Sequence, residues 1–99
     1  MATKDEAKRY LCNTSSEQCF WVNNGPILKN LEELANALPD INDETFNHHV
    51  NSEKNDFSSW IKDIIGDNTL ANDLLSSRTK ESAVNKIRRR LNSLRKRAG

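Results

Sequence analysis

Two cysteines and two adjacent histidines are the side chains of this 99-residue chain best suited to hold a metal ion. Cys12, Cys19, His48 and His49 together offer the sulfur and nitrogen ligands of a tetrahedral zinc site. Such sites use short Cys-x2–4-Cys and His-x3–5-His spacings, which neither the interval between the cysteines nor the adjacent histidines match. We therefore expect no metal, free thiols, His49 at the edge of the core beside Phe46, and His48 either exposed or capping a neighbouring loop.

Carboxylates and aromatic side chains form no clearer catalytic pattern. Asp56, Asp63 and Asp67 are interpreted as a helix cap and surface acids before an acid–base pair, because they lie near predicted helix ends. Trp21 and Trp60 could stack on nucleobases, but the helical spacing around Trp60 favours the core. The chain has no phosphate-binding glycine loop, nucleophile elbow or metalloprotease motif. We predict that the protein is not an enzyme and uses no cofactor.

Cations at the C-terminal end are the most distinctive chemical pattern. Residues 78–99 contain nine lysines and arginines and one acid, whereas residues 1–77 contain six basic and thirteen acidic residues. Both cations bind phosphate, and arginine can do so through two parallel hydrogen bonds. The candidate nucleic-acid-binding residues are Lys80, Lys86, Arg88, Arg89, Arg90, Arg95, Lys96 and Arg97.

This charge pattern predicts a small, non-enzymatic, chromosome-associated protein that binds DNA, or alternatively RNA, with little sequence specificity. The alternative is a protein–protein interaction module, with an acidic helical body that binds a protein partner and a solvated or self-associating basic tail. A membrane-surface helix is disfavoured because the tail has no aromatic residue. No long apolar run or secretory signal is visible, so we expect a cytoplasmic location, at the nucleoid if DNA is bound.

The elements that must position these cations follow from the apolar spacing. On a helix over residues 80–98, one narrow stripe holds Val84, Ile87, Leu91, Leu94 and Ala98. This spacing predicts a basic amphipathic helix whose stripe packs on the body or on a second copy. In the second case, Val84, Ile87, Leu91 and Leu94 would form a homodimer.

The rest of the chain predicts a mainly α fold with a small β part. Residues 19–22 and 27–28 flank an Asn-Gly turn and predict a short hairpin. Three to four short helices follow before the last one, which gives four to five helices after the hairpin. We divide the chain into a polar arm or short helix over residues 1–18, a compact domain over residues 19–77 and the basic helix over residues 78–99. We expect the core between residues 19 and 75, and residues 19–77 to fold without the tail.

Three short motifs carry a resemblance to a known family. They are His-His-Val at residues 48–50, Asn-Asp-Phe-x-x-Trp at residues 55–60 and Ile-Gly-Asp-x-x-Leu-Ala at residues 65–71. With the hairpin before them, they resemble a small family of domains of unknown function that occurs in archaeal and bacterial proteins. The resemblance covers roughly residues 19–75 and implies a hairpin-plus-helices module; it implies no activity, cofactor or partner.

Overall fold

Polar residues at the helix starts explain much of the fold. The computed structural model describes residues 2–99, and within them each of the six α-helices begins after a side chain that accepts a hydrogen bond from a first-turn backbone N–H group. Four of these caps are asparagine or aspartate at positions that follow a loop. The helices and their caps are α1 (Lys4–Tyr10, Thr3), α2 (Leu31–Ala37, Asn30), α3 (Asp43–His49, Asn42), α4 (Asp56–Trp60, Asn55), α5 (Asn68–Leu74, Asp67) and α6 (Lys80–Ala98, Thr79).

The hairpin is short and lies between α1 and α2 in the chain. Strands β1 (Phe20–Trp21) and β2 (Ile27–Leu28) pair antiparallel, with Phe20 opposite Leu28 and Trp21 opposite Ile27. Two 3-10 turns, η1 (Ser16–Gln18) and η2 (Leu38–Asp40), precede β1 and follow α2. The prediction of a mainly α fold with one small hairpin and a long last helix is confirmed.

The helix that begins with α4 changes its winding before it ends. After Trp60 the chain continues as a π-helical segment, η3 (Ile61–Ile65), and Gly66 then adopts a φ of 90°. This left-handed conformation suits glycine, and its N–H group donates to the carbonyl of Ile61 at 2.7 Å. The next residue, Asp67, is the N-terminal cap of α5.

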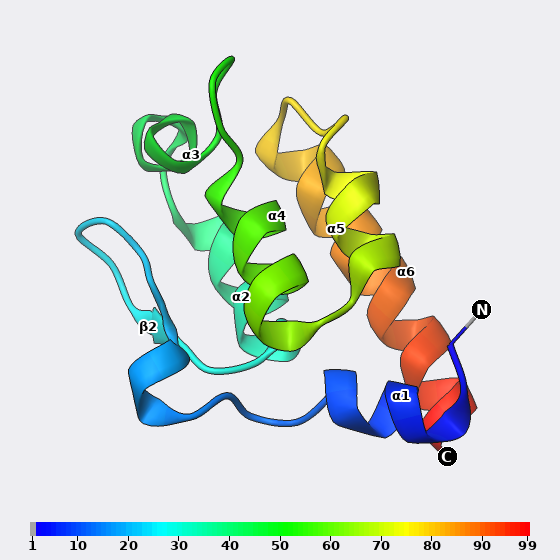
Figure 1. The fold of residues 1–99 in the computed structure, drawn as a ribbon. Coiled ribbons are helices and arrows are strands. Elements are labelled where there is room, and N and C mark those ends of the chain that lie inside the picture. Colours follow the sequence, from blue (N-terminus) through cyan, green and yellow to red (C-terminus); the bar gives the residue numbers. More distant parts are fainter. Residues whose placement is uncertain (1) are drawn as a thin grey trace.

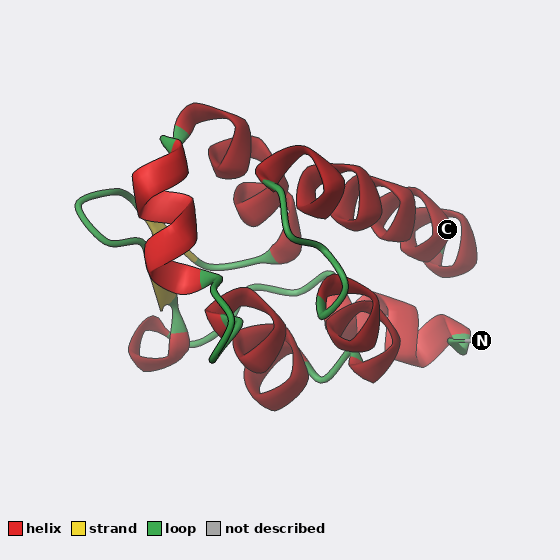
Figure 2. Ribbon diagram, turned by 90° about the horizontal axis from the view of Figure 1, so that it is seen from above, coloured by secondary structure: helices red, strands yellow, loops and turns green. Residues whose placement is uncertain are grey.

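The elements are spread between two sides of the molecule. Figure 1 shows the hairpin and α3 on one side and α6 on the other, with α2, α4 and α5 between them. Helix α1 packs against α6, so both chain ends lie at the same end of the molecule. Seen from above, Figure 2 shows α6 running along one border of the molecule, with the hairpin at the opposite side.

One apolar core joins all three parts of the chain. It contains Ala7 and Tyr10 from α1, and it also contains Ile87, Leu91 and Leu94 from α6, each at most 7% exposed. The expectation of a core confined to residues 19–75 is therefore wrong, because α2 and α5 bury their apolar faces against α6. The predicted domain boundaries after residues 18 and 77 remain a prediction from composition. Across residues 2–99, none of the helices combines the length and the hydropathy that a bilayer crossing requires.

Candidate nucleic-acid interface

The apolar stripe predicted for the last helix is buried inside the same chain. Val84, Ile87, Leu91 and Leu94 are buried against the body, and Ala98 packs at its edge. This burial fixes the rotation of α6 about its own axis, because the side chains opposite the stripe must then point into solvent. It also means that the stripe is covered by the body of the chain and is not a free surface for a second copy.

Two of the eight candidate cations bind backbone carbonyls at helix ends. The Nζ of Lys80 donates to the carbonyls of Ile41 at 2.7 Å and Pro39 at 3.4 Å, just after η2 and within it. The Nζ of Lys86 donates to the carbonyl of Asp73 at 2.9 Å, near the end of α5. Ammonium groups suit these positions because the last carbonyls of a helix lack partners and carry partial negative charge. Both lysines therefore attach α6 to the body.

Arg90 is a partly buried residue, with 15% of its side chain exposed, that binds a buried carboxylate. Its Nε and Nη2 donate to the two carboxylate oxygens of Asp67 at 2.7 and 2.9 Å. The side chain of Asp67 is only 1% exposed, and it also caps α5 by accepting from the N–H of Leu70. The hydrogen bond to Asp67 raises the pKa of Arg90, although burial acts in the opposite direction. Arg90 is thus unavailable to phosphate, and Asp67 is buried instead of a surface acid.

Three of the candidates remain open to a ligand. Arg88, Arg89 and Lys96 are exposed and form no hydrogen bond or ion pair with the described residues. Arg95 pairs with Glu32 at 3.2 Å, but both side chains are about half exposed, so phosphate could replace this carboxylate. Arg97 is exposed in the last turn. Of the predicted residues, Arg89 and Lys96 therefore lie opposite the buried stripe, and Arg88 is exposed on the flank that also carries Arg95.

Sequence reasoning missed three further cations. Lys4, Lys8 and Arg9 are exposed on α1, the helix that packs along α6 (Figure 1). The guanidinium of Arg9 lies 5.4 Å from the ring centre of Tyr10. The Thr3 and Glu6 capping box is a local signal for this helix. No local signal shows that the helix docks beside the tail.

His49 is held by two hydrogen bonds that leave neither ring nitrogen free. The backbone N–H of Asn23 donates to Nε2 at 3.0 Å, so the proton of the neutral ring lies on Nδ1, which faces the Asp56 carboxylate at 3.0 Å. Burial acts to raise the pKa of Asp56, but the hydrogen bonds from His49 and Lys54 hold that pKa below its ordinary value. His49 thus joins the hairpin to α3 and α4. His48 is exposed, as predicted.

The other side chains considered for metal or catalysis are dispersed. Cys12 is exposed and Cys19 is partly buried, and both are free thiols. Within residues 2–99, no three histidine, cysteine or carboxylate side chains gather in a way that would hold a metal ion. Trp60 is buried in the core, as predicted, and its indole N–H donates to the carbonyl of Gln18 at 2.8 Å. Asp63 is exposed.

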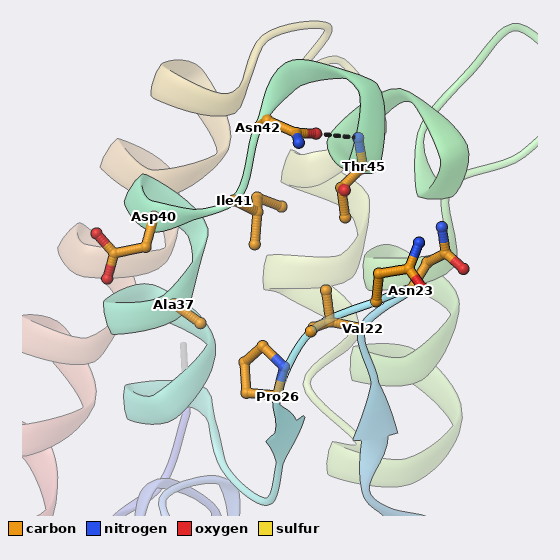
Figure 3. Close-up of a pocket in the computed structure, with 10 residues that line it drawn as sticks. Val22, Asn23, Pro26, Ala37, Asp40, Ile41, Asn42 and Thr45 are labelled. Carbon is orange, nitrogen blue, oxygen red and sulfur yellow. Dashed lines mark hydrogen bonds between the residues drawn. The ribbon is translucent and has the colours of Figure 1, made fainter.

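A cavity of about 270 Å³ lies between the hairpin turn and the segment from Ala37 to Thr45. Figure 3 shows Val22, Pro26 and Ile41 on its walls. The carboxylate of Asp40 points away from the cavity in this view, and Asn42 uses its side chain to accept from the N–H of Thr45. No acid, base and nucleophile converge among the residues that line it, so the cavity gives no support to a catalytic site.

No protein-family model, curated protein or solved structure matches this chain. The resemblance drawn from the three short motifs therefore stays a prediction. Their residues have structural roles in this chain: His49 bonds Asp56, Trp60 fills the core, and Gly66 turns the chain into the buried Asp67.

Proposed function

We propose that the protein binds duplex DNA through the outward face of α6, as a non-enzymatic protein that contacts mainly phosphates. The observation that supports this most directly is the fixed orientation of the helix. Because its apolar stripe is buried, Arg89 and Lys96 point away from the body and Arg88 is exposed on the flank, and none of the three pairs with another of the described residues. The proposal includes a chromosome-associated role at the nucleoid of the cytoplasm.

The remaining side chains of this face fit the same ligand. Between the cations, the exposed positions of α6 hold Asn85, Asn92 and Ser93, which can donate hydrogen bonds to phosphate oxygens. The single acid of the helix, Glu81, lies in its first turn. Few phosphate contacts give modest affinity, which should fall with salt in proportion to the number of contacts and vary little with sequence.

A duplex suits the face better than a single strand. Single-strand-binding surfaces combine cations with aromatic side chains on which bases stack. Helix α6 has no aromatic residue, and the exposed Trp21 belongs to the hairpin on the opposite side of the molecule (Figures 1 and 2). Recognition through the phosphates alone is what this composition supports.

A charge-neutralising double variant tests the proposal. Arg89→Gln with Lys96→Gln should weaken binding of duplex DNA almost equally for unrelated sequences. It should also lower the slope of log affinity against log salt by about 0.9 for each phosphate contact that is lost. Fluorescence anisotropy with labelled duplexes at several salt concentrations measures both quantities.

The matched control removes the same charge elsewhere. Lys29→Gln with Lys62→Gln changes two exposed lysines, one that follows β2 and pairs with Glu33 at 3.9 Å and one in η3, and should leave the salt slope unchanged. An equal slope in the α6 variant and the parent would remove DNA as the ligand of this face. Equal losses in the two double variants would show a response to net charge only.

A further inference from the structure

The outward face of the hairpin exposes two large apolar side chains side by side. Trp21 is 67% exposed and Ile27 is 51% exposed, and the two residues are directly opposite in the register of β1 and β2. On the inward face of the same strands, Phe20 and Leu28 are buried. A tryptophan is among the side chains with most to gain from burial, so this pair marks a contact surface.

The hairpin is held in place before any partner binds. The ring of Phe20 stacks on Phe57 with a centroid distance of 4.8 Å, and His49 accepts the N–H of Asn23 at the turn. A preformed surface loses little conformational freedom on binding, which favours its use as a contact. The hairpin can therefore present Trp21 and Ile27 in one orientation.

Carboxylates on the hairpin side of the molecule favour a positively charged binding partner. Residues 17–53 contain seven acids and one lysine, but Glu32 pairs with Arg95 of α6 and Glu33 pairs with Lys29, so these two acids are not counted for the hairpin side. Glu17 precedes β1, Asp40 lies by the cavity at the hairpin turn, and Asp43 and Glu44 follow in α3; all four are exposed. An exposed indole with exposed carboxylates on the same side of the molecule suits a guanidinium or ammonium group, through cation–π contact and ion pairing. The same charge repels DNA.

The complementary surface is present on the chain itself. Helix α6, which carries the exposed cations, lies on the side of the molecule opposite the hairpin in both ribbon views (Figures 1 and 2). With a formal net charge of +1, two copies repel each other little as whole molecules, while their unlike sides attract. We propose that the hairpin face of one copy receives the outward face of α6 of a second copy, with an α6 guanidinium stacked on Trp21.

This contact is heterologous and leaves one hairpin and one α6 face unused in every dimer. Such head-to-tail contacts extend into open chains unless the rotation between copies closes a ring. The inference goes beyond DNA binding, because it concerns a surface on the other side of the molecule and needs no nucleic acid.

Sedimentation velocity without DNA tests the association. The parent protein should show a mean mass that rises with protein concentration at low salt and returns to one chain near 1 M salt, where screening acts within about 3 Å. Trp21→Ser and the double variant Arg89→Gln with Lys96→Gln should each abolish the rise. Both variants should melt at the temperature of the parent, because the substituted side chains are exposed.

Mixing the two variants distinguishes this contact from other modes of association. The Trp21→Ser protein retains its α6 face and the double variant retains its hairpin, so together they should form a complex of two chains that does not grow further. A parent that stays monomeric at low salt, or variants that do not restore association in the mixture, would overturn the inference. If Trp21→Ser abolishes self-association and the α6 double variant does not, the hairpins of two copies pair with each other. That result would also overturn the inference. Salt-dependent binding to DNA by Trp21→Ser is measured separately, so the two proposals stand or fall independently.

Discussion

Arg89 and Arg90 are neighbours in the sequence with different roles in the fold. Successive helical residues lie about 100° apart, so one guanidinium points into solvent while the other meets Asp67. The sequence shows the helix and its stripe, from which the direction of Arg89 follows. It does not show the partner of Arg90, because Asp67 lies 23 residues away and is brought close only by the packing of α5 on α6.

Replacing each of these arginines by methionine should separate the two roles. Arg90→Met leaves the Asp67 carboxylate buried without its partner, and the free energy of unfolding should fall by about 3–5 kcal/mol. Arg89→Met removes an exposed charge and should change the free energy of unfolding by about 0.5 kcal/mol or less. Urea unfolding followed by circular dichroism measures both. Similar values for the two variants would contradict the structural role of Arg90.

The Asp56 carboxylate should make stability depend on pH in the acid range. Its pKa is below its ordinary value of 3.8 in the folded protein, so the folded state favours the ionised form. The resulting stability is complete above 3.8 and is lost as the pH falls through the lower folded pKa. The melting temperature of the parent should therefore fall on acidification, measured by thermal unfolding from neutral pH downward.

Asp56→Asn provides the comparison for this pH dependence. The amide keeps the shape and an oxygen that accepts from His49 and Lys54, but it does not titrate. The difference in melting temperature between the parent and this variant should be largest near neutral pH and shrink as the pH falls below 3.8. A difference that stays constant over the whole range would show that the carboxylate charge contributes nothing.

At the scale of the elements, signals confined to a few residues were sufficient to predict several helices and the hairpin. The Asn-Gly turn predicted the hairpin, capping residues predicted helix starts, and the stripe through Ile87 predicted α6. The docking of α1 and the π-helical winding of η3 could not be predicted in this way. Both depend on which apolar faces meet in three dimensions, and that information is spread over the whole chain.

Removing α6 should unfold the remaining chain, in contrast to the expectation from sequence that residues 19–77 fold alone. The apolar faces of α2 and α5 would become exposed, and fully buried residues such as Leu31 and Leu70 would lose part of their shielding. A chain ending at Ser77 should show little helical circular dichroism and no cooperative melt. A chain lacking only Ala98 and Gly99 is the control and should melt like the parent. A cooperative melt of the chain that ends at Ser77 would show that the core is stable without α6.

At the scale of the whole molecule, opposite charges are separated by position, and the overall pI of about 7.8 conceals this. The sequence showed the separation along the chain but not that Lys80, Lys86, Arg90 and Arg95 are bound by the body. If both proposals hold, DNA and a second copy use the same face of α6 and exclude each other. The state of the protein would then depend on which of the two is more concentrated.

The packing of α1 against α6 brings both chain ends to the same end of the molecule (Figure 1). In topological terms, the chain is close to a ring with a single gap. A linker across the gap would allow the backbone to be opened elsewhere, for example at the exposed loop around Ser52 and Glu53. For the same reason, the whole fold could be inserted into a surface loop of another protein, which would enter and leave it at one corner without crossing the hairpin or the outward face of α6.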